Sequence, residues 1–481
     1  MQADVAIVGA GAAGLATAIF AARRNPKCRL VALDGANKLG AKILVSGGGR
    51  CNVTNTVVTE ADFWGGSRNL IRRVLRAFPA EQTIHFFREI GVTLHEEEHG
   101  KLFPDTHSAR TVLQALLNEA KRLGVAVLPA HRVVDVTFQR RHFIVTSNVG
   151  EPRLEARADD PRDLPQSGPR EPARAEGRGS EFERHDSVLS AKDGGLRVGT
   201  IIAPKVVLAT GGMSLPKTGS DGTGYRIAQH LGHSLIPATP ALAPLILEGD
   251  FHVPLSGISQ EIELTVRVPR PSHSEGTAGG TSQSAIRNPQ SAIPPIRLRG
   301  AMLWTHFGVS GPVIMNASRF WHRAKLESRT AQLLANFLPG ESFESAEKRL
   351  IELAQAQPKT FLHNALATLL PARVALAVLQ HLHVGADKPM AHVSRDDRRK
   401  LVHALLEWPL PVRDSRGFNY AEVTAGGVPL EEIDPATMES RKCPGLYLVG
   451  EILDVDGRIG GFNFQWSWSS ARVAASALAA V

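Results

Sequence analysis

The chain has 481 residues, 43% of them hydrophobic, which is enough for two or three domains with a large buried core. No apolar run reaches the ~18 residues of a membrane span, and we see no signal segment at the start of the sequence. The three cysteines are widely spaced and indicate neither disulfides nor a metal site. The formal net charge is +8; residues 151–198 contribute −2, so the rest of the chain carries +10 and forms a basic body. Without a signal segment we expect a cytoplasmic protein.

The first elements follow the pattern of a nucleotide-binding fold. Residues 4–9 form an apolar run typical of a buried parallel strand, residues 12–24 are rich in Ala and predict a helix, and residues 29–34 predict a second strand. Together they predict a strand–helix–strand unit. Helices are then expected over 68–78 and 108–123, and strands over 124–147.

Two segments lack the composition of a folded core. Residues 151–197 are dense in Arg, Glu, Asp, Pro and Gly, so we interpret them as a disordered insertion in a hairpin. Residues 270–296 contain the tetrapeptide Gln-Ser-Ala-Ile twice and are interpreted as a disordered surface loop. The alternating segment 262–268, just before this loop, predicts an antiparallel strand with one solvated face.

The pattern turns helical over residues 341–411. Leu362, Leu366, Leu369 and Leu370 fall on one stripe of a helix, which indicates a helical subdomain. Strand and glycine-rich patterns return at 419–429 and 445–451, and a final helix is expected over 463–479. The chain therefore leaves the nucleotide-binding fold near residue 240 and returns to it near residue 412.

The glycine spacing after the first strand is that of a dinucleotide-binding turn. Gly9 allows a tight turn, Gly11 lets a pyrophosphate approach the backbone, and Gly14 lets the helix pack on the strand. The helix N-terminus then offers free N–H groups to the phosphates, and Asp34 ends the second strand where a ribose hydroxyl is expected. The residues expected at the phosphates are Gly9, Ala10, Gly11, Ala12, Ala13 and Gly14.

Three later segments add polar, glycine-rich loops to this turn. Residues 40–55 hold three consecutive glycines, an Arg and two Asn, a density of donors that suits a phosphate or a flavin edge and is rare in linkers. Residues 209–212 follow a strand, and residues 445–465 predict a strand, a loop and a helix start that stabilises a reduced flavin. Glu451 is placed for ribityl or ribose hydroxyls. Further candidate cofactor contacts are Lys42, Ser46, Gly48, Gly49, Arg50, Cys51, Asn52, Val133, Thr210, Gly211, Gly212, Gly450, Asp454, Gly460, Gly461, Phe462 and Asn463.

The motifs at 42–55 and 450–465 resemble a bacterial flavoprotein family that includes the ribosomal RNA dihydrouridine synthase, a bile-acid enone reductase and an aminoacetone oxidase. Residues 305–312 are similar to a further motif of that family, whereas Asp34 stands where the family more often has Glu. The resemblance covers nearly the whole chain except the two low-complexity segments. It implies FAD and an α/β fold: a discontinuous Rossmann-like FAD-binding domain at 1–150, 198–240 and 412–481, with an inserted domain that is β-rich over 241–340 and helical over 341–411.

In such a flavoprotein the protein supplies orientation and proton transfer, while FAD carries the hydride. Cys51 is a candidate proton donor, although a small packing residue beside FAD explains it as well. His306 and Lys101 are further candidate acids, with backbone hydrogen bonding and surface exposure as the respective alternatives. The sequence has no second Gly-x-Gly-x-x-Gly unit, so we expect NAD(P)H only as a transient electron donor at the open face of the flavin.

Two clusters of basic residues have two interpretations: they bind RNA phosphates, or they are the solvated face of a helix. They are Arg68, Arg72, Arg73 and Arg76 in the first, and Arg395, Arg398, Arg399 and Lys400 in the second. Three functions remain open: reduction of uridine in large-subunit ribosomal RNA, an enone reductase or amine oxidase for small molecules, and a non-enzymatic flavin-binding factor associated with RNA. The sequence does not indicate an oligomeric state.

Overall fold

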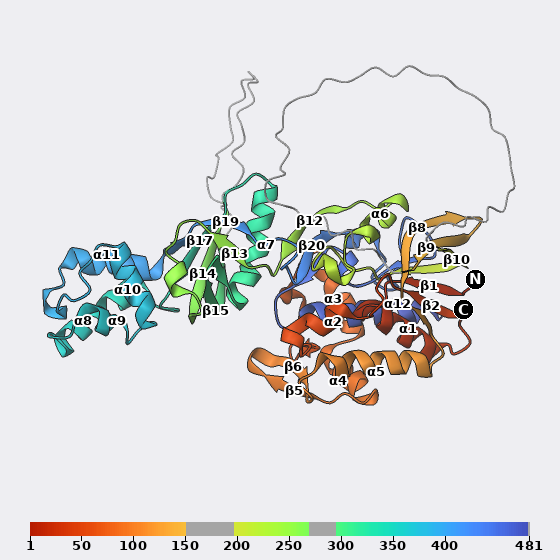
Figure 1. Ribbon diagram of the computed structural model, residues 1–481, viewed down its shortest axis with the longest axis horizontal. Helices are drawn as coiled ribbons and strands as arrows, with labels where there is room; N and C mark the ends of the chain where they lie inside the picture. The colour runs from red at the N-terminus through yellow and green to blue at the C-terminus, as the bar shows by residue number, and fades with distance from the viewer. Residues whose placement is uncertain (151–196, 269–294, 480–481) are drawn as a thin grey trace, which may run out of the picture.

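The computed structural model describes residues 1–150, 197–268 and 295–479. The two segments predicted to be disordered, 151–197 and 270–296, lie almost entirely outside these described residues. A Rossmann-like part lies on the right in Figure 1, and a part built from an antiparallel sheet and several helices lies on the left. This arrangement confirms the predicted fold class.

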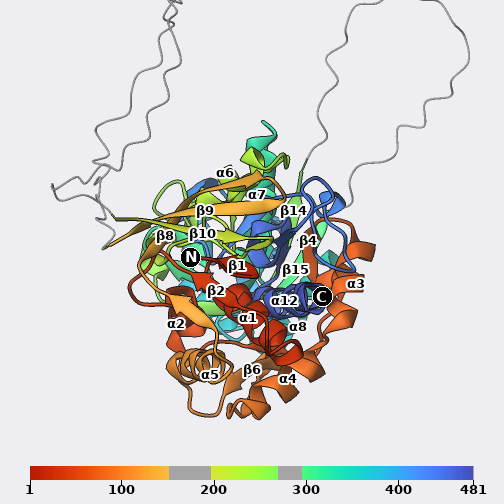
Figure 2. The ribbon, with the colours of Figure 1, turned by 90° about the vertical axis from the view of Figure 1, so that its right-hand side faces the viewer.

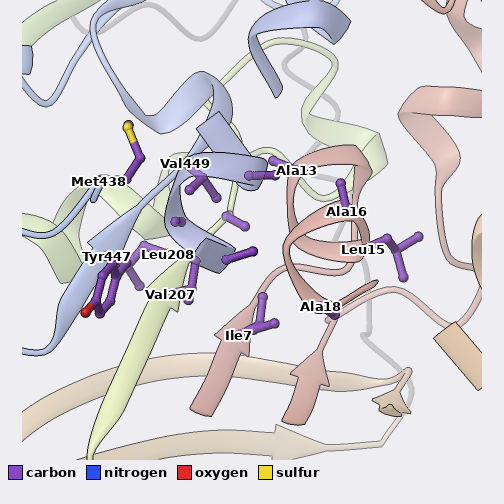
Figure 3. Packing of buried hydrophobic residues seen from close by; sticks show 14 of the residues in the cluster. Ile7, Ala13, Leu15, Ala16, Ala18, Val207, Leu208, Met438, Tyr447 and Val449 are labelled. Carbon is purple, nitrogen blue, oxygen red and sulfur yellow. The ribbon is translucent and has the colours of Figure 1, made fainter. Parts of the chain in front are cut away.

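A parallel sheet forms the centre of the Rossmann-like part, because most of its strands are short apolar runs that are buried on both faces. Its strand order is β21 (Leu446–Leu448), β11 (Lys205–Leu208), β1 (Val5–Val8), β2 (Leu30–Leu33) and β7 (Ala126–Leu128). Helices α1 (Ala12–Arg24) and α12 (Phe462–Leu478) pack side by side, so the first and the last helix of the chain belong to one layer (Figure 2). Ile7, Leu15 and Val207 join strand and helix in one apolar core (Figure 3).

Shorter elements complete this part of the molecule. The helices are α2 (Ala41–Val45), α3 (Arg68–Ala77), α4 (Ala80–Glu89), α5 (Ala109–Arg122) and α6 (Thr223–His230). The antiparallel sheets are β8 (His131–Gln139), β9 (His142–Val149) and β10 (Arg197–Ala203), then β3 (Thr54–Asn55), β6 (Lys101–Pro104) and β5 (Leu94–Glu97), and finally β4 (Phe63–Gly65) with β22 (Val455–Gly457).

The second part has its own sheet and its own core. Its seven antiparallel strands are, in order, β18 (Trp408–Leu410), β17 (Gln332–Asn336), β14 (Ser259–Arg267), β15 (Ile296–Thr305), β16 (Gly308–Ser310), β13 (Leu245–Leu247) and β19 (Val412–Ser415). Its helices are α7 (Pro312–Leu326), α8 (Phe343–Ala356), α9 (Leu362–Leu366), α10 (Ala372–His381) and α11 (Arg395–Leu406). Buried Trp304 and Leu264 belong to this core.

Two short strands differ from the expected layout. Trp408–Leu410 lies in the segment predicted to be helical, but it pairs with β17, since Trp408 is buried against Phe337 and Phe251. Val412–Ser415 pairs with β13, so the seven-stranded sheet continues past residue 412. The other domain boundaries stay predictions.

The chain passes between the two parts along a pair of neighbouring strands. β12 (Ile236–Ala241) pairs antiparallel with β20 (Val423–Gly427). A small buried cluster of Ala241, Leu242, Val423 and Ala425 lies at this connection. Among the helices of the described ranges, none combines the length and hydrophobicity needed to cross a membrane.

Candidate cofactor and active site

A cavity of about 390 Å³ lies where the parallel strands end. Val8 ends β1, Leu33 ends β2, and Ala209 follows β11; all three line the cavity. In an open α/β sheet, the crevice outside the carboxyl ends of the strands is where ligands bind. The walls also come from α2, from the start of α12 and from the segment before β20, so distant parts of the chain meet here.

The turn between β1 and α1 is shaped by its glycines. Gly9 has a φ of +100°, which favours glycine. A Cβ on Gly14 would lie 1.8 Å from the carbonyl oxygen of Gly9, so α1 packs on the turn only with glycine there. Among the described residues no side chain caps α1 at Gly11, and a Cβ on Gly11 would meet nothing within 4 Å. The first N–H groups of α1 therefore present a partial positive charge at the cavity wall.

Asp34 lines the cavity at the end of β2 and is anchored by the backbone. Its Oδ2 accepts the N–H of Ala10 at 2.8 Å, and its Oδ1 accepts the N–H of Ala36 at 2.9 Å. The carboxylate thus fixes the glycine turn, and each oxygen keeps a lone pair for a hydroxyl.

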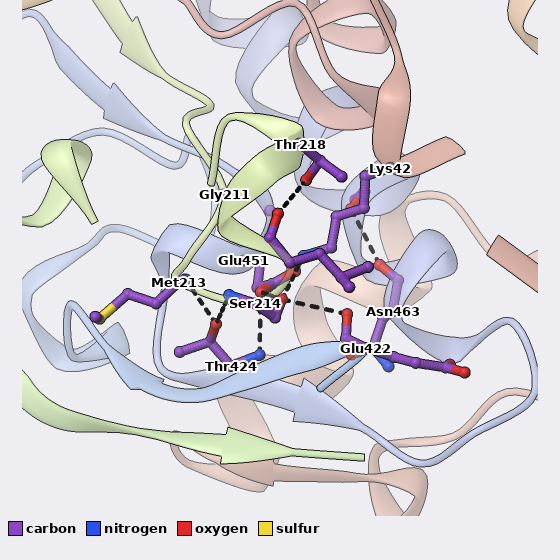
Figure 4. A network of polar contacts seen from close by, with 12 residues as sticks. Lys42, Gly211, Met213, Ser214, Thr218, Glu422, Thr424, Glu451 and Asn463 are labelled. Atoms are coloured by element: carbon purple, nitrogen blue, oxygen red, sulfur yellow. Dashed lines mark hydrogen bonds and ion pairs between the residues drawn. The ribbon is translucent and has the colours of Figure 1, made fainter. Parts of the chain in front are cut away.

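A polar network joins α2 to the return segment (Figure 4). The Lys42 ammonium lies 2.7 Å from a Glu451 carboxylate oxygen and donates to the Ser214 hydroxyl at 2.6 Å. Glu451 also accepts from the Ser214 hydroxyl at 2.9 Å and from the Thr424 N–H at 3.0 Å. Both charged side chains are mostly buried, so the pair depends on these additional hydrogen bonds.

The loop after α2 turns back through three glycines with positive φ, Gly47, Gly48 and Gly49. Arg50 pairs with Glu97 at 2.6 Å and lies over the Phe103 ring, so it is held at the cavity wall. The Asn52 Oδ1 is buried beside the cavity and has no hydrogen-bond partner among the described residues. A buried acceptor of this kind indicates a missing donor from a ligand.

The start of α12 closes the site. A Cβ on Gly461 would lie 2.4 Å from the carbonyl oxygen of Thr54, so only glycine lets the two loops approach this closely. The Asn463 side chain accepts the N–H of Gly457 at 2.7 Å and donates to its carbonyl oxygen at 2.9 Å. The segments around residues 50 and 460, predicted to belong to one site, lie against each other.

Comparison with known proteins identifies the family. A family profile described as HI0933-like protein Rossmann domain matches residues 3–158 and 174–477. The chain belongs to the HI0933-like family. Members of this family are FAD-dependent oxidoreductases.

Two curated relatives match the HI0933-like chain along nearly its full length. The ribosomal RNA dihydrouridine synthase of Escherichia coli (strain K12) is 30% identical over 477 residues, covering 99% of this chain and 98% of the relative. The 3-dehydro-bile acid delta(4,6)-reductase of Clostridium scindens is 27% identical over 475 residues, again covering 99% and 98%. Among solved structures, a 3-ketosteroid-delta4-(5alpha)-dehydrogenase from Rhodococcus jostii RHA1 matches at 14% identity with a TM-score of 0.43, covering 100% of this chain and 97% of that one.

The structure brings most of the residues predicted to contact the cofactor to the cavity of this HI0933-like protein. Those that line it are Gly9, Gly11, Ala12, Ala13, Asp34, Lys42, Ser46, Arg50, Asn52, Val133, Thr210, Gly211, Glu451, Gly460, Gly461 and Asn463. Those outside the lining are Ala10, Gly14, Gly48, Gly49, Cys51, Gly212, Gly450, Asp454 and Phe462.

The predicted contacts outside the lining have packing or turn environments instead. Gly14 packs α1 on the turn, and Gly212 lies against the Thr424 side chain. Phe462 packs edge-on to Phe63. Asp454 is half-buried, and burial together with the neighbouring Asp456 raises its pKa to about 6.

The three candidate acids have different positions. Lys101 lines the cavity. His306 is exposed in the turn between β15 and β16 and is outside the lining. Cys51 is fully buried behind the lining with a φ of +63°, and burial raises the pKa of its thiol to about 12. The geometry therefore favours the packing interpretation of Cys51, and its catalytic role stays a prediction.

Iodoacetamide at pH 8 is expected to alkylate the folded protein at Cys28 well before Cys51. Burial raises the pKa of both thiols, but Cys28 is only partly buried, whereas Cys51 is inaccessible with a pKa of about 12. The thiolate is the reacting form, so Cys51 should be almost inert. Peptide mass spectrometry measures both rates, and denaturant should equalise them. Rapid alkylation of Cys51 in the folded protein would contradict this position.

Several residues of the cavity and of the network behind it carry no motif, and the sequence analysis did not predict them. Ser214, in the Lys42–Glu451 network, follows the Gly211-Gly212 pair by two residues, so that motif could have been extended to it. Thr424 and the cavity residue Glu422 lie at β20, where no local pattern indicates a site. Arg132 pairs with Asp221 across the rim, again without a sequence signal.

The two basic clusters belong to different parts of the molecule (Figure 1). On α3, Arg68, Arg73 and Arg76 are exposed and form no ion pair with a described residue, while Arg72 pairs with Glu60 at 2.6 Å. On α11, Arg398 lies 3.5 Å from Glu347, Arg399 lies over the Phe343 ring, and Lys400 donates to the Leu382 carbonyl. Each cluster has three exposed cations without an ion pair among the described residues, but on α11 two of them make other contacts, a cation–π contact and a backbone hydrogen bond, whereas those on α3 make neither.

Proposed function

We propose that this protein uses FAD to reduce a carbon–carbon double bond conjugated to a carbonyl, with uridine in large-subunit ribosomal RNA as the substrate. The observation that carries the proposal is the cavity itself, where a glycine turn and an uncapped helix end meet the unpartnered Asn52 oxygen. The two relatives support the reaction class, since one is named a ribosomal RNA dihydrouridine synthase and the other a bile-acid reductase.

The residues present fit FAD. The N-terminus of α1 would hold the pyrophosphate, Asp34 a ribose hydroxyl, and the Asn52 oxygen would accept from an N–H of the ring. Lys42 and Glu451 offer polar atoms between these positions. Bound FAD supplies the hydride chemistry, taking two electrons from a donor and passing them to a substrate. The chain's own groups bind, orient and exclude water.

NAD(P)H is proposed as the electron donor. The described residues contain one parallel sheet and one Rossmann-like crevice, which leaves no separate dinucleotide domain among them. We therefore propose that NAD(P)H approaches the flavin transiently through the same cavity.

The first experiment is an anaerobic absorption spectrum of the purified protein with NADH, followed by addition of ribosomal RNA that lacks dihydrouridine. Flavin bleaching by NADH and its return on addition of RNA would support the proposal. Dihydrouridine mapping in a deletion strain gives an independent test, and persistence of every dihydrouridine would exclude the RNA substrate.

A small-molecule enone is the second candidate substrate. Apolar side chains at the cavity wall, Leu215, Leu242, Val423 and Ile459, favour an apolar substrate. If an enone restores the flavin spectrum and RNA does not, the small-molecule activity is the correct one.

The α3 cluster is expected to contribute most of the RNA affinity. Replacing Arg68, Arg73 and Arg76 with glutamine should weaken RNA binding at least tenfold and reduce the slope of log affinity against log salt by about 2, because three phosphate contacts are lost. Filter binding across a salt series measures both. Replacing Arg395 and Arg399 on α11 with glutamine is the matched control and should change little. A larger effect at α11 would place the RNA on the helical subdomain instead.

A further inference from the structure

Glu422 is held at the cavity by its backbone. It directly precedes β20, and its N–H donates to the Leu242 carbonyl oxygen at 3.1 Å. Its own carbonyl oxygen accepts the Ser214 hydroxyl at 3.3 Å. Glu422 is thus fixed on both sides, between the connecting strands and the Lys42 network, while it lines the cavity.

The Glu422 carboxyl differs from the other acids of the cavity. Four carboxyl groups line it: Asp34, Asp221, Glu422 and Glu451. Asp34 accepts two backbone N–H groups, Asp221 pairs with Arg132, and Glu451 pairs with Lys42. No described residue forms a hydrogen bond or ion pair with the Glu422 carboxyl, and its side chain is directed away from the Lys42–Glu451 pair (Figure 4).

The surroundings of this side chain favour its protonated form. The residue is exposed where it opens to the cavity, and the rest of its surroundings is the protein of the cavity wall. Burial raises the pKa of Glu422, and the Lys42 charge offsets this in part. Lys42 is already paired with Glu451, so its charge is largely neutralised there.

We propose that Glu422 is the acid that protonates the substrate carbon next to the carbonyl group. The inference rests on the proposed reduction of a conjugated double bond. A hydride adds to the far carbon of that bond, and the electron pair of the double bond forms a new C–H bond at the near carbon as the Glu422 O–H bond breaks. The carboxylate then regains a proton from solvent. Uridine and enones have the same conjugated arrangement, so one acid serves both.

Substitution of Glu422 by glutamine keeps the size of the side chain and removes its acidic proton. The E422Q variant should still bind FAD, and NADH should reduce that flavin at a rate within threefold of the wild type. Reoxidation of the reduced flavin by the substrate should fall about 100-fold or more, the range that a general acid contributes. The control E431Q changes an exposed glutamate on the 3-10 turn Leu430–Glu432 and should behave as the wild type. Reoxidation of E422Q within threefold of the wild type would overturn the proposal.

A second readout does not need a substrate. A group whose pKa is raised on folding stabilises the protein at low pH, and that contribution is lost as the pH rises through the raised value. The difference in unfolding free energy between the wild type and E422Q should therefore fall as the pH rises above 4.5, the ordinary pKa of the carboxyl, while the difference for E431Q stays flat. The charge that acts on Glu422, Lys42 from α2 with its partner Glu451, is common to all three proteins and cancels.

Failure of the proposed function and failure of the Glu422 proposal give different results. If the wild type reduces neither enone nor RNA, the proposed function fails, whereas a falling stability difference still supports a protonated Glu422. If the stability difference for E422Q is flat, the carboxyl is ionised at neutral pH and cannot be the proton donor, whatever the substrate is.

Discussion

Replacing Gly14 with alanine is expected to yield a protein that retains almost no flavin. The added Cβ would lie 1.8 Å from the Gly9 carbonyl oxygen and 3.0 Å from its carbon, and both atoms belong to the backbone. Neither can move without opening the turn between β1 and α1, so the free energy of unfolding should fall by about 3 kcal/mol, the upper range for overpacking. The flavin-to-protein absorbance ratio and a denaturant titration measure the two effects.

Gly11 and Gly385 are the matched controls for this substitution. A Cβ on Gly11 meets nothing within 4 Å, so alanine there should cost less than about 1 kcal/mol of stability as a poorer helix cap. It would still intrude on a pyrophosphate, and FAD affinity should fall at least tenfold. Alanine at Gly385, where the nearest atom is 3.9 Å away, should change neither property. If the Gly11 variant bound FAD as well as the wild type, the phosphates would not lie at this turn.

Replacing Lys42 with methionine is expected to destabilise the protein by about 3 kcal/mol, because the mostly buried Glu451 carboxylate then has no cation beside it. The hydrogen bonds from Ser214 and Thr424 to Glu451 would remain, but they do not neutralise its charge. FAD retention should decrease as well, since Lys42 lines the cavity. Chemical denaturation with and without added FAD separates the two losses.

The double variant K42M/E451Q tests whether the loss comes from the pair. Removing both charges should recover much of the stability, since no uncompensated charge is left. The exposed pair Lys348–Glu352, 3.8 Å apart, offers a comparison in which K348M should have little effect. Equal losses in K42M and K42M/E451Q would show that the ion pair does not couple the two residues.

The fold class and the glycine turn could be predicted because their signals are local. The spacing of Gly9, Gly11 and Gly14 follows from one strand entering one helix, and the structure places this turn at the end of β1. The segments at 42–55 and 450–465 carry motifs dense enough to be assigned to one site. Both contribute to the cavity lining.

Other parts of the site depend on contacts that no local pattern encodes. Glu422 reaches the cavity only because β20 pairs with β12 and the chain folds back there. Cys51 lies in a predicted cofactor loop, yet its positive φ places the side chain behind the lining, which a sequence pattern cannot reveal. His306 lies in a recognisable motif, but the β15–β16 turn carries it outside the lining.

The antiparallel pairing of β12 and β20 makes the second part of the molecule modular. The chain leaves and re-enters the Rossmann-like part through strands that are neighbours, so a whole unit can be exchanged at this seam while the parallel sheet keeps its connections. Leu242 and Val423, at the seam, also line the cavity. An exchange of the unit would therefore alter this stretch of the cavity wall and leave the glycine turn after β1 unchanged, so one cofactor cradle could serve cavities of different shape.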